Sequence, residues 1–141
     1  EVFDFSKLVR ETSSLYASDD LQIHLEITED VMVYADVDLM RQILNNLIIN
    51  AVQSHVEKPG YVEVCLEVKA HKLLLSIEDK GQGISDMNTA DIFKSYFTTK
   101  ENGTGIGLVF AKKGIEQAGG NIWFETKKGV GTTFFITMPR A

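Results

Sequence analysis

Hydrophobic and polar residues alternate along six stretches of the chain, as in β-strands that bury one face. Three other stretches space their hydrophobic residues as helices do. The expected strands span residues 21–30, 31–36, 61–69, 73–79, 121–126 and 132–139, and the expected helices span about 6–17, about 37–58 and 107–120. This order predicts a single domain, residues 1–141, in which helices cover one face of a mixed sheet.

Capping and turn residues mark several ends of these elements. Ser6 is the expected N-cap of the first helix, and either Asp36 or Asp38 is expected to cap the second. A turn near Asp30 separates the first two strands, and Gly119 follows the third helix as a glycine stop. From residue 80 to residue 107 the periodic pattern is lost, and a connection of this length is usually either a functional lid or disordered.

The second helix carries an unusual row of side-chain amides, because Gln42, Asn46, Asn50 and Gln53 fall within an arc of about 80°. Asn45 lies off this row and is expected to be structural. One interpretation is that neighbouring backbone groups satisfy these amides. The other is that the row faces an oxygen-rich ligand or a metal such as Mg²⁺, which prefers oxygen ligands.

Three glycine clusters favour the second interpretation: "DKGQG" after a strand, "GTGIGL" opening a helix, and "GVGTTF" opening the last strand. Glycines let backbone N–H groups approach phosphate oxygens, and a helix N-terminus adds a favourable dipole. "GTGIGL" alone is a poor dinucleotide fingerprint, because no strand precedes it and no acidic residue follows about 20 positions later. A P-loop is excluded, because its lysine-containing motif is missing.

Composition restricts the remaining classes of function. The chain has 141 residues, 44% of them hydrophobic, 24% charged, and a net charge of −6, which argues against nucleic-acid binding. No hydrophobic run is long enough to span a bilayer, and no signal-peptide pattern is present, so we expect a soluble domain without membrane contact. The single cysteine, Cys65, excludes an internal disulfide and is expected to be a small core side chain.

Five motifs in order resemble a known family. "QILNNLIINA", "DKGQGI", "IFKSYFTTK", "GTGIGL" and "GVGTTF" are similar to the N, G1, F, G2 and G3 boxes of bacterial sensor histidine kinases, which are related to gyrase, Hsp90 and MutL. The resemblance covers residues from about 36 to the C-terminus, and the "FTTK" motif is most similar to nitrogen-regulation sensor kinases. It implies an α+β two-layer sandwich of the Bergerat type, with a mostly antiparallel sheet, about three helices and a long ATP lid.

The resemblance also implies ATP and Mg²⁺ as cofactors and a role for each matching residue. Asn50 would coordinate Mg²⁺, Asn46 would face the triphosphate, and Asp79 would accept a hydrogen bond from the adenine amino group. The remaining nucleotide contacts, in the adenine loop and lid (residues 80–107) and beyond it, would come from Gly81, Gly83, Ile84, Lys94, Lys100, Gly103, Thr104, Gly105, Gly107, Leu108 and Thr132. Lys100 would join Asn46 and Asn50 in catalysis by neutralising phosphate charge.

Two departures from the family pattern concern the amide row. Gln42 replaces the glutamate that activates water in hydrolytic relatives, and an amide cannot act as a general base. Transfer of the phosphoryl group to another acceptor is therefore favoured over hydrolysis of ATP by water. Gln53 stands where a lysine is common, so one phosphate contact is missing from the expected set.

None of the three histidines, His24, His55 and His71, lies in a phosphoacceptor motif. Because the chain begins at Glu1 without a methionine, we expect it to be a piece of a longer protein, with residues 1–18 following a dimerisation domain that carries the acceptor histidine. A response regulator would act downstream. We expect the domain itself to lie in the cytoplasm, whether or not the parent protein is attached to the membrane.

Two other functions remain open at this point. The first is a serine kinase of the anti-sigma-factor type, which would share the fold and differ in the acceptor. The second is a nucleotide-sensing module that docks a partner, through aromatic residues such as Phe93, Tyr96 and Phe97, without transferring phosphate.

Overall fold

The computed structural model describes residues 1–55, 59–81 and 106–141. Five strands form a twisted sheet in the order β2-β4-β5-β7-β6, in which β2 and β4 are parallel and the other pairs are antiparallel. Their bounds are β2 Leu21–Ile27, β4 Gly60–Lys69, β5 Lys72–Asp79, β6 Asn121–Lys127 and β7 Gly131–Pro139. The expected mixed, mostly antiparallel sheet is confirmed.

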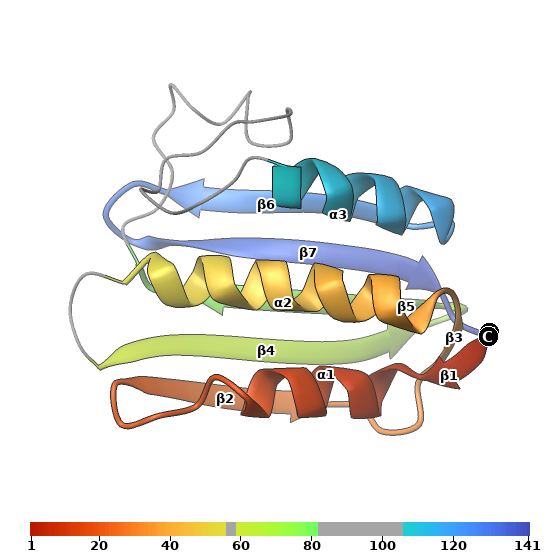
Figure 1. Cartoon of the computed structure of the whole chain (residues 1–141), viewed down its shortest axis with the longest axis horizontal. Helices are drawn as coiled ribbons and strands as arrows, with labels where there is room; N and C mark the ends of the chain where they lie inside the picture. The colour runs from red at the N-terminus through yellow and green to blue at the C-terminus, as the bar shows by residue number, and fades with distance from the viewer. Residues whose placement is uncertain (56–58, 82–105) are drawn as a thin grey trace.

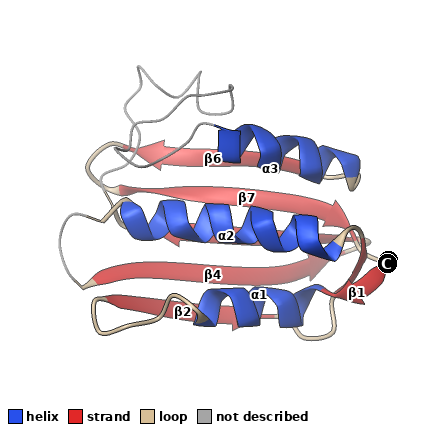
Figure 2. Cartoon of the chain, viewed as in Figure 1, coloured by secondary structure: helices blue, strands red, loops and turns tan. Residues whose placement is uncertain are grey.

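Three helices cover one face of this sheet, as the sequence predicted (Figure 1, Figure 2). They are α1 Phe5–Ser14, α2 Val37–Gln53 and α3 Ile106–Gln117. The side chain of Asp36 caps α2 by accepting from the N–H groups of Asp38 and Leu39. Of the two residues expected as the cap, Asp36 is therefore the N-cap and Asp38 lies in the first turn. After α3, Gly119 adopts a φ of 83°, a left-handed conformation that glycine reaches without strain.

The core lies between the two layers and is centred on α2. The buried side of this helix is formed by Met40, Ile43, Leu44, Leu47, Ile48 and Ala51. Alternate residues of β4 and β5 meet them from the sheet, among them Val64 and Leu75. Helix α3 packs closely against α2, since a Cβ on Gly114 would lie 2.6 Å from Cδ1 of Ile43. The tight packing fixes α2 relative to the sheet and therefore fixes the side chains on its other side.

The structure corrects the expected start of the first helix. Asp4, not Ser6, is the N-cap of α1, and its carboxylate accepts from the N–H of Lys7 at 3.0 Å. Ser6 is buried, donates to the carbonyl of Thr28 at 2.6 Å, and accepts from the N–H of Val31 at 3.0 Å. Its hydroxyl holds the connection after β2 against the helix, a long-range role that the local capping pattern does not reveal.

A small second sheet was also missed. Strand β1, Val2–Asp4, pairs antiparallel with β3, Met32–Tyr34, apart from the five-stranded sheet. The expected strand at 31–36 therefore exists in shortened form but does not join its neighbour β2. Asp30, with a φ of 59°, forms the expected turn between them. Within the described residues, no helix is both long and hydrophobic enough to cross a membrane.

Candidate functional site

Several element ends meet at one end of the sandwich, away from the two termini (Figure 1). Helix α2 ends there, β5 ends there, and the turn between β6 and β7 closes there. Beside this turn lies an open hollow of about 400 Å³, lined by Glu78, Asp79, Lys80, Glu125, Thr126, Lys127, Val130, Gly131, Thr132 and Thr133. Backbone and side chains from three strands thus surround the last residue of β5.

That residue, Asp79, is a buried carboxylate with only 6% of its surface exposed. Its Oδ1 accepts from the N–H of Gly81 at 2.9 Å and from the N–H of Thr132 at 3.2 Å. Burial raises the pKa of Asp79, while these two donors, the Ser54 hydroxyl and the nearby His55 act in the opposite direction. The carboxylate is therefore oriented by fixed donors in a poorly solvated place, as in sites that recognise a ligand.

The glycines on either side of Asp79 let the backbone approach closely. A Cβ on Gly131 would lie 2.2 Å from the carbonyl oxygen of Asp79, and Gly131 has a φ of 149°. A Cβ on Gly81 would lie 2.2 Å from Oγ of Ser54 and 2.5 Å from its carbonyl oxygen. Directly after β5, the backbone at Gly81 therefore lies in close contact with the end of α2.

Thr132 contacts Asp79 through its backbone, as the pairing partner of Asp79 across β5 and β7. Its hydroxyl lies 2.8 Å from the hydroxyl of Thr126 on the neighbouring strand β6. Sequence reasoning selected Thr132 but missed Thr126, which also donates to the carbonyl of Gly131 at 3.2 Å. The cross-strand register brings Thr126 and Thr132 together, and only the structure supplies that register.

The amide row lies on the less buried side of α2. Gln42 and Gln53 are exposed, and Asn46 and Asn50 are half-buried. Asn45 lies off the row, and its Oδ1 accepts from the hydroxyl of Tyr16 at 2.8 Å, which confirms that it is structural. Asn50 lies in the last turn of the helix, whose end approaches Gly81, and Asn46 lies one turn earlier.

Other expected nucleotide contacts cannot be placed. Gly83, Ile84, Lys94, Lys100, Gly103, Thr104 and Gly105 lie outside the described residues, as do Phe93, Tyr96 and Phe97. Gly107 is in the first turn of α3. Leu108 is 7% exposed and belongs to the core, so it anchors the start of α3 against the rest of the domain.

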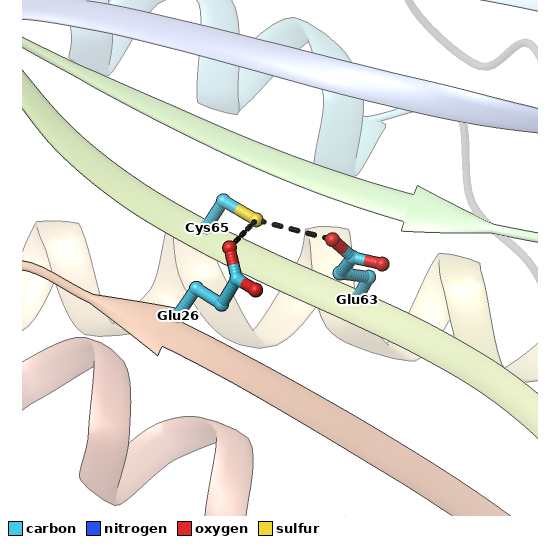
Figure 3. A group of neighbouring side chains, drawn as sticks. All are labelled: Glu26, Glu63 and Cys65. Atoms are coloured by element: carbon cyan, nitrogen blue, oxygen red, sulfur yellow. Dashed lines mark hydrogen bonds between the residues drawn. The ribbon is translucent and has the colours of Figure 1, made fainter.

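A separate polar cluster lies on the face of the sheet that the helices leave open. It corrects the expectation for Cys65, which alternates with the buried Val64 and Leu66 and so points away from the core. The thiol contacts Glu63 Oε1 at 3.4 Å and Glu26 Oε2 at 4.0 Å (Figure 3). The alternation along β4, which puts Cys65 on the same face as Glu63, is the signal in the sequence that could have corrected this expectation.

This surrounding makes the thiol a poor nucleophile. Burial together with the neighbouring carboxylates of Glu63 and Glu26 raises the pKa of Cys65 to about 11. We expect iodoacetamide to alkylate Cys65 at pH 8 roughly tenfold or more slowly than a free cysteine, because little thiolate is present. Glu63→Gln should speed alkylation, and Glu125→Gln, on distant β6, should not. A wild-type rate equal to that of free cysteine would contradict this account.

Known proteins share both the sequence and the fold. The family model described as histidine kinase-, DNA gyrase B-, and HSP90-like ATPase matches residues 35–141. Sporulation kinase B of Bacillus subtilis is 32% identical over 143 residues, covering 99% of this chain and 33% of that protein. Sensor histidine kinase ZraS of Escherichia coli K12 is 33% identical over 144 residues, covering 99% and 31%. This chain thus spans about a third of these relatives.

Among solved structures, the nucleotide-free catalytic domain of histidine kinase ThkA superposes with a TM-score of 0.86. Its sequence is 31% identical, and the match covers 99% of this chain and 95% of that one. The similarity therefore extends over the whole domain, including residues 1–34, which the family model does not reach.

Proposed function

Because the chain belongs to the family of histidine kinase-, DNA gyrase B- and HSP90-like ATPases, and matches a histidine kinase catalytic domain along its length, we propose a specific activity for it. The domain binds ATP with Mg²⁺ and transfers the γ-phosphoryl group to a histidine on a separate dimerisation domain. A response regulator then receives the phosphoryl group. The observation that carries this proposal is the buried Asp79 at the end of β5, which lies close to the end of the helix that carries the amides.

Asp79 has the chemistry needed to recognise adenine. The exocyclic amino group of adenine is a hydrogen-bond donor, and an ionised carboxylate is acceptor-only. Guanine presents a carbonyl oxygen at the equivalent position, so two acceptors would meet there. Because two backbone N–H groups fix Oδ1 of Asp79, the carboxylate cannot rotate away from an unsuitable base without losing them.

Asn46 and Asn50 suit the phosphate end of the nucleotide. They are one helical turn apart on α2, half-buried, and their amide oxygens are ligands that Mg²⁺ accepts. Asn50 would hold the ion and Asn46 would bind the triphosphate. When bound, Mg²⁺ neutralises phosphate charge during transfer. Gln42 is exposed at the start of the row, and its amide cannot take a proton from water.

The histidines of the chain are poor phosphoacceptors in their observed places. His24 lies on β2 beside Glu26, with Nε2 3.2 Å from the carboxylate, on the face of the sheet opposite the helices. His71 lies in the turn between β4 and β5. Both ring nitrogens of His55 contact backbone groups. An acceptor supplied by another domain of the parent protein is consistent with these positions.

Phosphoryl transfer tests the proposal. The chain is incubated with γ-labelled ATP, Mg²⁺ and the dimerisation domain of its parent protein, and label on the acceptor is followed before and after acid treatment. We expect acid-labile label, because phosphohistidine hydrolyses in acid. Acid-stable label would indicate the serine kinase instead. ATP binding without transfer would indicate a nucleotide-sensing module.

The close contact between Gly81 and Ser54 gives a further expected outcome. Gly81→Ala places a methyl group against the backbone of Ser54, so the chain after Asp79 must move. We expect ATP affinity to fall about tenfold, with a melting temperature within a few degrees of wild type, because the displaced segment lies outside the core. Gly129→Ala is the matched control, since a Cβ there has nothing within 4 Å, although its φ of 81° adds local strain. Unchanged affinity in Gly81→Ala would contradict the expected position of the base.

A further inference from the structure

His55 stands directly after the C-cap of α2 and contacts three separate parts of the backbone. Its Nδ1 lies 2.9 Å from the carbonyl oxygen of Ala51, in the last turn of the helix. Its Nε2 lies 3.2 Å from the N–H of Tyr61, at the start of β4, and 3.3 Å from the N–H of Lys80, directly after Asp79. One imidazole therefore joins the end of α2 to two neighbouring strands of the sheet.

These contacts distinguish between the two tautomers of the neutral ring. The N–H groups of Tyr61 and Lys80 can only donate, so Nε2 must carry a lone pair. The carbonyl of Ala51 can only accept, so Nδ1 must carry the hydrogen. In the neutral ring of His55, the hydrogen therefore lies on Nδ1. No other ring tautomer satisfies all three backbone groups.

The surroundings are shaped to hold this ring. A Cβ on Gly60 would lie 2.9 Å from Cγ of His55, so the backbone of Gly60 can approach the imidazole only because no side chain is there. On the other side, Ser54 is in close contact with Gly81, and the N–H of Gly81 donates to Asp79. Residues 54 and 55, directly after the helix, therefore contact both residues that follow Asp79.

We propose that His55 is a positioning residue that sets the distance between the two halves of the nucleotide site. One half is α2 with Asn46 and Asn50, and the other is the end of β5 with Asp79. By bonding both Ala51 and Lys80, the imidazole fixes the carboxylate of Asp79 relative to the amide row. This inference rests on the proposed function, because it assigns adenine to Asp79 and the phosphates to α2.

Nucleotide binding by a set of variants tests the inference. His55→Phe keeps a ring of similar size but removes both polar atoms, so Tyr61 and Lys80 lose their acceptor. We expect ATP to bind about tenfold more weakly and the preference for ATP over GTP to fall. His55→Gln, whose amide can both accept and donate, should recover most of the affinity. His71→Phe, a matched change at an exposed histidine, should bind ATP as wild type does.

A double-mutant cycle with Asp79→Asn separates positioning from a merely structural role. If His55 acts through Asp79, then adding His55→Phe to Asp79→Asn should weaken ATP binding by no more than about twofold. Fully additive losses, or wild-type affinity and base preference in His55→Phe, would overturn the inference.

Two measurements on the wild-type protein do not depend on nucleotide. Nitrogen NMR of the imidazole should show the Nδ1–H tautomer, and the amide protons of Tyr61 and Lys80 should exchange slowly. An Nε2–H tautomer or fast exchange at both amides would overturn the inference even if His55→Phe did not fold. Failure of the wild-type protein to bind ATP would instead refute the proposed function, and the contacts of His55 would then be judged on tautomer and exchange alone.

Discussion

Asp79→Asn is expected to weaken ATP binding by about a hundredfold or more, the largest effect of any single change considered for this domain. Asparagine has nearly the same shape as aspartate, and its Oδ1 can still accept from Gly81 and Thr132. The amide nitrogen then occupies the place of the second carboxylate oxygen. The hydrogens of this amide face the hydrogens of the adenine amino group, so two hydrogen-bond donors meet and no bond forms. A site built for one hydrogen bond rejects a mismatched group strongly.

Calorimetric titration with Mg-ATP measures this effect, and thermal unfolding supplies the control. The pKa of Asp79 is raised in the folded protein, so the native state holds its proton to a higher pH than the unfolded state. Asp79 therefore contributes stability below its unfolded pKa, and this contribution is lost as the pH rises through the folded pKa. Because asparagine does not ionise, the Asp79→Asn variant does not lose this stability as the pH rises. We expect it to melt at pH 7 at the same temperature as wild type or higher, although it binds ATP about a hundredfold more weakly.

The two readouts together make the prediction specific. If the Asp79→Asn variant bound ATP normally, the adenine base would have to lie away from Asp79. A variant that melted well below the wild type would show that the carboxylate is needed for the fold, and weaker binding would then carry no information about adenine recognition.

The ATP affinity of the wild-type protein should also decline as Asp79 becomes protonated. This decline should occur at a higher pH than for an ordinary aspartate, because the pKa of Asp79 is raised.

Asn50→Ala is expected to remove the Mg²⁺ dependence of ATP binding. The alanine side chain offers no oxygen, and it continues the helix well, so α2 should remain intact. We expect Mg-ATP to bind at least tenfold more weakly than to wild type, while binding of ATP in the presence of a chelator changes little. Phosphoryl transfer should be lost almost completely, because transfer relies on charge neutralisation and positioning.

Asn45→Ala is the matched control for this variant, since it removes an amide from the next turn of the same helix. Asn45 bonds Tyr16, so its loss should lower the melting temperature and leave the affinity for Mg-ATP unchanged. If the two variants bound Mg-ATP equally well, the assignment of the metal to Asn50 would be wrong. Titrating each protein with ATP at several Mg²⁺ concentrations distinguishes the two results.

The sequence alone predicted the sheet, the three helices and the candidate residues of α2 and β5, because each depended on a local pattern. The helical spacing of the amides separated Asn45 from Asn46 and Asn50, and the structure gives Asn45 the structural role expected of it. Asp79 was selected because "DKGQGI", which follows a strand directly, resembles the G1 box of sensor histidine kinases. Its burial and its two fixed donors agree with that selection.

Features that depend on distant backbone groups could not be found in this way. Ser6 fits a capping pattern, but its hydroxyl bonds residues 22 and 25 positions away. The sequence showed only that His55 lies outside a phosphoacceptor motif, and nothing near it reveals that it bonds Tyr61 and Lys80. Cys65 differs from these: it was expected in the core, and that prediction was wrong although the alternation of β4 puts it on the same face as Glu63, opposite the buried Val64 and Leu66.

The most direct test of the account is a crystal structure of the domain with Mg²⁺ and a non-hydrolysable ATP analogue. We expect the adenine amino group within hydrogen-bond distance of Asp79, the ion on the amide oxygen of Asn50, and the triphosphate beside Asn46. The contacts of His55 with Ala51 and Lys80 should be retained. A nucleotide whose base lies away from Asp79, or a metal that does not contact Asn50, would contradict the account.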